Sequence, residues 1–279
     1  MPVSKLKNLV LLVLLLANLA LLALLVPDRL SQAREDAALR QSLCDLYAGQ
    51  QVSLDPAVVP DTVTIYALEL AQDPDAAAAA AAALLGQELT LDDSSRFQSV
   101  YRANAGQCVI SRSGAFRASL EDRPEVRDLA KDAGKTLHAM GFQYSSLTGP
   151  QRLRAGFYTL TAAQTVLGVP VFSQGLTLTY ANDRLVQLEG VFYTGAGTLT
   201  RISDQPCISA ADALVAFLSA RIDLGWVGSA VTGMTQGYVR SETAGASVHL
   251  TPVWRLETDT GSFDINGITG EVTARASDA

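Results

Sequence analysis

The longest predominantly apolar stretch of the chain lies near its N-terminus, from Leu9 to Val26. Asn18 is its single polar residue. A helix over this stretch would cover about 27 Å, close to the hydrocarbon thickness of a bilayer. Lys5 and Lys7 precede the stretch. The pattern therefore predicts a single-pass membrane anchor over residues 9–26, with a cytoplasmic tail of residues 1–8 and an extracytoplasmic body.

A cleaved signal peptide is the alternative interpretation of this segment, with Ser31-Gln32-Ala33 as a small-x-small cleavage site. The apolar run is longer than the roughly 7–15 residues usual for signal peptides, which favours the uncleaved anchor. Asn18 can hydrogen-bond across a helix interface, and small residues such as Ala20 and Ala23 allow helices to approach closely. These three residues are candidate contacts with a partner helix; for Asn18 the alternative is a polar residue that the span tolerates.

A helical pattern continues directly after the anchor, over residues 27–45. Asp28 can cap this juxtamembrane helix. Leu39, Leu43 and Leu46 follow at i, i+4 and i+7, which places them on one apolar stripe. The stripe is expected to pack on the protein's own body; packing on a partner's helix is the alternative.

Residues 46–148 alternate between strand and helix patterns and are expected to form a small N-terminal α+β subdomain. Alanine is the best helix former, so the alanine-rich tract needs no other explanation. The predicted elements are a strand over Val63–Leu68, a helix opened by Asp73-Pro74 and closed by Gly86, a hairpin of Gln107–Ser111 with Ala115–Ser119, and a helix over Pro124–Met140.

Residues 149–279 show the same mixture and are expected to form the C-terminal α+β subdomain. Ser209 with Asp212 three residues later predicts a capping box at the start of a helix. The predicted strands are Val169–Phe172, Leu176–Tyr180, Leu185–Phe192, Val248–Glu257, Ser262–Asn266 and Glu271–Ala274. The expected class is thus α+β: a transmembrane helix followed by two small subdomains, each an antiparallel sheet with helices.

The charge and the cysteine content of the chain limit the classes of partner and of covalent cross-link that are expected. The chain carries 21 Lys and Arg against 28 Asp and Glu, a net charge of −7. This acidic balance argues against nucleic acid as a partner. The three cysteines, Cys44, Cys108 and Cys207, contain no C-x-x-C pair and form no disulfide framework. A bridge between Cys108 and Cys207 remains one option.

The segment Asp259-Thr260-Gly261-Ser262 matches the D-T-G-S signature of aspartic proteases. Such enzymes need two carboxylates that share a proton, each presented by a loop of this kind. This chain has one D-[ST]-G, so it would have to dimerise, and its approach segment Leu256-Glu257-Thr258 is half polar. A hairpin turn, with Gly261 supplying backbone freedom, is the favoured interpretation.

The spacing of Asp264, Asn266, Gly267 and Glu271 resembles the scattered oxygen ligands of a calcium loop. Aligned on an EF-hand, however, the chain places Ser262 at position 1 and Thr273 at position 12, so both key carboxylates are missing. The sequence predicts a glycine-rich turn there, with no metal.

Other catalytic arrangements are weak. His138 and His249 each lack a second ligand at i+4, and a G-x-S-x-G nucleophile motif is absent. Neither an enzymatic activity nor a cofactor is expected.

A family resemblance rests on the helix opened by Ile208–Leu214 and on the segments Pro252–Glu257 and Phe263–Val272. Together they resemble a PepSY-type module, in which a helix lies beside a hairpin that ends in a D-x-x-T-G-E-V-like turn. Asn266 stands where an aspartate is common. The stretches Gly168–Phe172 and Leu178–Gly190, taken with the N-terminal anchor, resemble the YycH/YycI proteins.

The YycH/YycI resemblance implies a non-catalytic extracytoplasmic regulator of a membrane sensor histidine kinase, tied to cell-wall homeostasis. It also implies that the transmembrane helix contacts the kinase, and that a related accessory protein is a further partner. The alternative is an extracytoplasmic PepSY-type module that binds or inhibits a peptidase or binds a cell-envelope ligand. In that case the anchor only localises the protein.

Overall fold

The structure is a computed structural model that describes residues 14, 35–194, 199–242 and 247–275. Over these residues the chain is a mixed α+β protein, which confirms the predicted class. The strands form one network of pairings, but the buried side chains gather in two separate cores. The central unit, residues 74–191, surrounds one core. The terminal unit, residues 35–71 with 199–275, surrounds the other.

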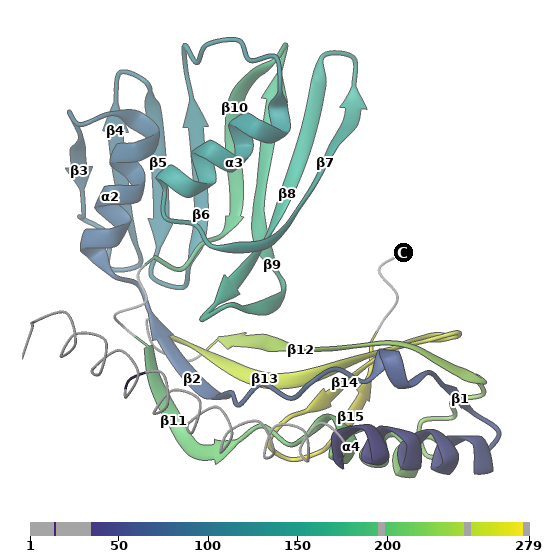
Figure 1. Ribbon diagram of the computed structural model, residues 1–279. Helices are drawn as coiled ribbons and strands as arrows, with labels where there is room; N and C mark the ends of the chain where they lie inside the picture. The colour runs from purple at the N-terminus through teal and green to yellow at the C-terminus, as the bar shows by residue number, and fades with distance from the viewer. Residues whose placement is uncertain (1–13, 15–34, 195–198, 243–246, 276–279) are drawn as a thin grey trace, which may run out of the picture.

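The central unit is an antiparallel sheet whose one face is covered by the helices α2 (Pro74–Leu85) and α3 (Leu129–Ala139) (Figure 1). In space the strands follow the order β7-β8-β9-β10-β6-β5-β4-β3. Their bounds are β3 (Thr90–Asp92), β4 (Gln98–Ala103), β5 (Gly106–Ser111), β6 (Ala115–Leu120), β7 (Tyr144–Arg154), β8 (Phe157–Val166), β9 (Val169–Ala181) and β10 (Arg184–Val191).

Local capping explains where the two helices start. The Asp73 carboxylate accepts hydrogen bonds from the first backbone N–H groups of α2, as its sequence predicts. Helix α3 begins at Leu129, later than the predicted Pro124, because Asp128 is its cap and accepts from the Lys131 N–H at 3.0 Å. The preceding Val126 N–H donates to Asp183, so this segment is tied to the β9–β10 turn instead of entering the helix.

The terminal unit is a second sheet, with α4 (Ala210–Ala220) and the helix of residues 35–49 on one face (Figure 1). The order β11-β2-β13-β12 is extended by β14 and β15 along part of β13, and β1 pairs in parallel with β12. The bounds are β1 (Ser53–Leu54), a 3₁₀ turn (Pro56–Val58), β2 (Tyr66–Ala71), β11 (Leu199–Pro206), β12 (Ala230–Glu242), β13 (Ser247–Thr258), β14 (Gly261–Asn266) and β15 (Val272–Ala274).

Helix α4 is fixed on this sheet by its cap and by aromatic packing. Ser209 and Asp212 form the predicted capping box. Phe217 packs against Phe263 with ring centres 5.0 Å apart. The Trp254 indole N–H donates to the carbonyl of Ile208 at 2.9 Å, which satisfies the polar end of a fully buried ring.

The two units do not follow the predicted division of the chain at residues 148 and 149, which falls inside β7. The strands β7 to β10 join the earlier hairpin, since β10 pairs with β6 with Leu188 opposite Ala118. Strand β2, in turn, pairs with β13 and β11 of the terminal unit. The central unit is therefore an insertion within the chain of the terminal unit, an arrangement made by long-range pairing.

Candidate functional site

The predicted membrane contacts Asn18, Ala20 and Ala23 lie outside the described residues, as does the run Leu9–Val26 apart from Leu14. Among the helices that the structure does describe, none is both long enough and apolar enough to cross a bilayer.

The helix of residues 35–49 packs on the terminal unit, as expected, but through a different stripe. Leu43 is buried, whereas Leu39 and Leu46 are 51% and 44% exposed. The second anchor of the helix is Tyr47, which is fully buried. Tyr47 lies at i+4 from Leu43, so the two side chains share one face of the helix. The buried stripe therefore consists of Leu43 and an aromatic ring, and not of the three leucines that the sequence suggested.

Polar contacts hold the C-terminal half of this helix against α4. The Tyr47 hydroxyl donates to the Leu214 carbonyl at 2.8 Å. Burial raises the pKa of Tyr47, so the hydroxyl remains a protonated donor at neutral pH. Arg221 at the end of α4 donates to the backbone carbonyl and the side chain of Gln50, at 3.2 and 2.8 Å. The helix is thus built into the terminal unit.

The contacts between the central and terminal units form a seam, which includes hydrogen bonds, a strand pairing and an aromatic contact with an arginine. The chain leaves the terminal unit through Gln72, and its amide group bonds to the returning segment. The Gln72 side chain donates to the Phe192 carbonyl at 2.7 Å and accepts from the Thr194 backbone at 2.8 Å and hydroxyl at 2.9 Å. The chain crosses between the two units twice, at Gln72 and at residues 192–194, and the Gln72 side chain joins these two crossings by hydrogen bonds.

A second part of the seam is the turn-proximal end of β9, which reaches onto the terminal sheet. Val171 pairs with Tyr238 of β12. The next residue, Phe172, places its ring 3.8 Å from the guanidinium carbon of Arg255 on β13. A Cβ atom at Gly237 would lie only 2.5 Å from the same ring, so glycine is what allows the ring to lie flat on the sheet there.

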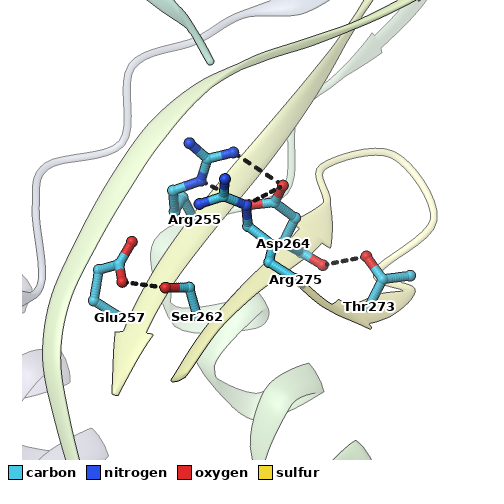
Figure 2. A network of polar contacts seen from close by, with 6 residues as sticks. All are labelled: Arg255, Glu257, Ser262, Asp264, Thr273 and Arg275. Atoms are coloured by element: carbon cyan, nitrogen blue, oxygen red, sulfur yellow. Dashed lines mark hydrogen bonds and ion pairs between the residues drawn. The ribbon is translucent and has the colours of Figure 1, made fainter. Parts of the chain in front are cut away.

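Figure 2 shows the polar network that holds Arg255. Arg255 donates to both oxygens of Asp264 on β14, at 2.9 and 3.1 Å. Arg275 approaches the same carboxylate at 3.8 Å. The Thr273 hydroxyl donates to the Asp264 carbonyl at 3.2 Å. Because Arg255 and Asp264 are only 14% and 17% exposed, this bidentate pair is screened little and keeps the guanidinium in one orientation.

A third part of the seam surrounds Tyr193. Its hydroxyl donates to the Ser113 carbonyl at 2.7 Å, and Arg240 donates to the same oxygen at 2.9 Å. The neighbouring Gly114 has φ +84°, and a Cβ atom there would lie 2.5 Å from the Tyr193 ring. The turn between β5 and β6 is thus shaped to receive an aromatic ring from the other crossing.

The D-T-G-S segment makes the predicted hairpin connection: Asp259 and Thr260 form the turn after β13, and Gly261 and Ser262 begin β14. The Asp259 carboxylate accepts from the backbone N–H of Ser229 at 2.8 Å and from its hydroxyl at 2.9 Å. These hydrogen bonds, that from the backbone foremost, lower the pKa of Asp259. The carboxylate ties two loops of the terminal unit together.

The glycine-rich segment is the predicted turn between β14 and β15. The Asn266 side chain accepts from the backbone of Ile268 at 2.8 Å and of Thr269 at 3.1 Å, which closes an Asx turn. Asp264, a carboxylate of the calcium pattern, is bound by Arg255 and Arg275. Within the described residues no three His, Cys, Asp or Glu side chains are grouped so as to hold a metal ion.

The cysteines are free: Cys108 is buried in the central core and Cys207 in the terminal core, so the optional bridge between them does not form. Burial raises the pKa of Cys108 to about 12, which keeps its thiol protonated and unreactive. His138 and His249 lie in different units, on α3 and β13.

No protein-family model and no curated protein matches this chain. Among solved structures, an uncharacterized protein from Eubacterium rectale ATCC 33656 is 11% identical with a TM-score of 0.45, over 78% of this chain and 89% of that chain. The Bacillus megaterium YpeB C-terminal domain is 12% identical with a TM-score of 0.37, over 74% of this chain and 99% of that chain. Likenesses this distant do not assign a family.

Sequence reasoning did not identify the seam residues. Gln72, Phe172 and Tyr193 are separated by long stretches of chain, and each belongs to an ordinary local pattern. Glycine was the one signal: Gly114 lies in the turn of the predicted hairpin and Gly237 within β12, and a glycine in a strand often marks the close approach of another group. The partner of each glycine is fixed by the tertiary fold and could not be read from spacing.

Proposed function

We propose that the protein is a membrane-anchored, extracytoplasmic, non-catalytic regulator of a sensor histidine kinase, with a PepSY-like terminal unit. The observation that carries the proposal is the attachment of the helix of residues 35–49. Residues 27–34 alone separate this helix from the apolar run Leu9–Val26, and Leu43 and Tyr47 build it into the terminal core. We therefore expect a displacement of the membrane segment to be transmitted to the folded body through this helix. A change in the body should be transmitted to the membrane segment by the same route.

The PepSY-like assignment of the terminal unit is supported by the placement of α4. This helix contacts β14 and β15, the hairpin that ends in the Asn266 turn. A helix beside such a hairpin is the arrangement that the sequence resemblance implied.

The proposal is tested by replacing Leu9–Val26 with an unrelated apolar anchor of equal length, and separately by Asn18→Leu. The anchor swap should weaken the protein's regulation of kinase phosphorylation in cells, and Asn18→Leu should weaken it more mildly. The sensitivity of the extracytoplasmic body to added protease should stay unchanged in both variants. The small and polar residues of the native span offer specific helix contacts that a generic anchor lacks. Normal regulation by the swapped protein would contradict the proposal.

The second candidate is a module that binds or inhibits a peptidase or binds a cell-envelope ligand. It is favoured by an open groove of about 720 Å³ on the face of the central sheet that α2 and α3 leave uncovered, lined by Gln98, Gln107, Arg117, Thr177 and Glu189 among others. In this case the swapped anchor would retain full activity, and substitutions such as Arg117→Ala in the groove would reduce it.

A further inference from the structure

A cavity of about 280 Å³ opens between α2 and the strands β4 and β5, next to the Gln72 crossing. One wall is apolar and is formed by Pro74, Ala77 and Ile110. The remainder is polar and includes Asp93, Ser99, Tyr101 and Arg112. A cavity with an apolar wall and a few convergent polar groups is the usual form of a small-molecule site.

The sheet register explains why these side chains meet. Ser99 and Tyr101 are two residues apart on β4, so they lie on the same face, and Ile110 of β5 stands directly opposite Ser99. That face is the one covered by α2, whose Ala77 is small enough to leave space above the sheet. Arg112 follows just after β5, where its backbone N–H donates to the Phe97 carbonyl at 2.9 Å.

Two opposite charges border the cavity without neutralising each other. Arg112 has no side-chain hydrogen bond or ion pair with the described part of the chain. Asp93 accepts one hydrogen bond, from the Ser99 hydroxyl at 2.8 Å through Oδ1. Its second carboxylate oxygen is left for another donor. The cavity therefore presents one cation and one half-used anion to whatever enters it.

Tyr101 adds a neutral donor to the same cavity. The residue is only 4% exposed, and its hydroxyl has no hydrogen-bond partner among the described residues. The hydroxyl oxygen itself is not fully buried, so it is accessible from the cavity. Burial is the main cause that raises the pKa of Tyr101, and the nearby Asp93 carboxylate adds to it. The phenol thus stays protonated at neutral pH and can donate to an anion.

We infer that this cavity binds a small zwitterion, a free amino acid or a dipeptide with short side chains. Its carboxylate is received by Arg112 and the Tyr101 hydroxyl, its ammonium group by Asp93, and its apolar part by Pro74, Ala77 and Ile110. A simple anion would leave the Asp93 carboxylate unpaired and repelled, and a simple cation would do the same to Arg112. A ligand with both charges satisfies both walls.

The cavity lies next to the hydrogen bonds by which Gln72 joins the central and terminal units. Gln72 lines the cavity and at the same time binds the returning segment at Phe192 and Thr194. A ligand in the cavity therefore contacts the crossing that joins the central unit to the terminal unit. This binding site stands independently of the kinase proposal, and its test needs no kinase.

The test is calorimetric titration of the full-length protein in detergent with glycine, L-alanine and L-alanyl-L-alanine, and with propionate and propylamine as singly charged probes. At least one zwitterion should bind with a Kd on the order of 0.1–1 mM, as expected for so few atoms in an open site. The two singly charged probes should bind at least tenfold more weakly. Binding of propionate as tight as that of the best zwitterion would overturn the zwitterion assignment. So would the absence of binding by every zwitterion at concentrations about tenfold above the expected Kd.

Variants separate this cavity from other surfaces. Arg112→Gln and Asp93→Asn should each weaken binding of the best zwitterion by at least tenfold, and Tyr101→Phe by a fewfold factor. Arg112 and Asp93 are both exposed, so these changes leave the fold intact, which circular dichroism verifies. Arg96→Gln is the matched control: this exposed arginine follows Asp93 by three residues but does not line the cavity, and binding should be unchanged. Unaltered binding in the Arg112→Gln, Asp93→Asn double variant would overturn the proposal.

Discussion

The guanidinium carbon of Arg255 lies 3.8 Å from the centre of the Phe172 ring, and this contact joins a strand of the terminal unit to a strand of the central unit. Arg255 is held from the other side by two hydrogen bonds to Asp264 (Figure 2). The guanidinium is therefore held in one orientation against the ring. This preorganisation makes the contact more favourable than that of a freely rotating arginine.

The first prediction follows from that contact. Phe172→Ala should lower the free energy of unfolding by about 1–3 kcal/mol, because both the packing on Gly237 and the cation–π contact are lost. Urea unfolding followed by tryptophan fluorescence measures it, since Trp226 and Trp254 both belong to the terminal unit. Phe97→Ala is the control: this ring is 81% exposed and its loss should cost less than about 0.5 kcal/mol. Equal effects of the two changes would contradict the role of Phe172.

The second prediction concerns Gly114. Gly114→Ala should destabilise the protein by about 2 kcal/mol or more, because the new Cβ meets the Tyr193 ring at 2.5 Å in addition to the unfavourable φ of +84°. Gly141→Ala is the matched control, with φ +74° and no atom within 4 Å of the new Cβ. It should cost only about 1 kcal/mol. Thermal unfolding of both variants decides whether the Tyr193 contact adds the difference.

The third prediction is a pH dependence at Asp259. Its pKa is lowered in the folded protein, so the stability that it contributes is present above the ordinary carboxyl pKa and is lost as the pH falls through the folded value, below about pH 4. Asp259→Asn keeps a side-chain oxygen that can accept from Ser229, so the fold and any activity should persist at pH 7. The acid-dependent part of the unfolding free energy should be smaller in the variant. A loss of activity with the fold intact would instead revive the protease interpretation.

Local signals predicted the elements whose boundaries are set by neighbouring residues. The Asp73 cap of α2 and the Ser209–Asp212 capping box are each formed by residues within one turn of each other, so the local sequence is enough to predict them. The same holds for the turn at Asn266, which its own side chain closes. In each case the structure follows the prediction closely.

Pairing between distant segments could not be predicted in this way. Strand β10 has the pattern of a half-buried strand, but nothing in that pattern says that Leu188 lies opposite Ala118. The same limit applies to the start of α3, because the Asp183 carbonyl that holds Val126 comes from another turn. The division into two units and the seam between them both depend on such contacts.

The last prediction tests whether the helix of residues 35–49 transmits information between the membrane segment and the body. Tyr47→Phe removes the hydrogen bond to the Leu214 carbonyl and should cost about 1 kcal/mol locally, since the ring remains to fill its buried site. Hydrogen exchange in residues 35–49 should then accelerate by about fivefold, while exchange in the central unit stays unchanged. Tyr158→Phe is the control, because this hydroxyl has no hydrogen-bond partner among the described residues, and it should alter neither region.

Kinase output measured on the same Tyr47→Phe variant separates the two proposed functions. If the span acts on the body through this helix, loosening its attachment should weaken regulation while the protein remains folded and at its normal level. If exchange accelerates as expected but regulation is unchanged, the helix is only a tether. The activity would then belong to the folded body, as the binding-module alternative requires.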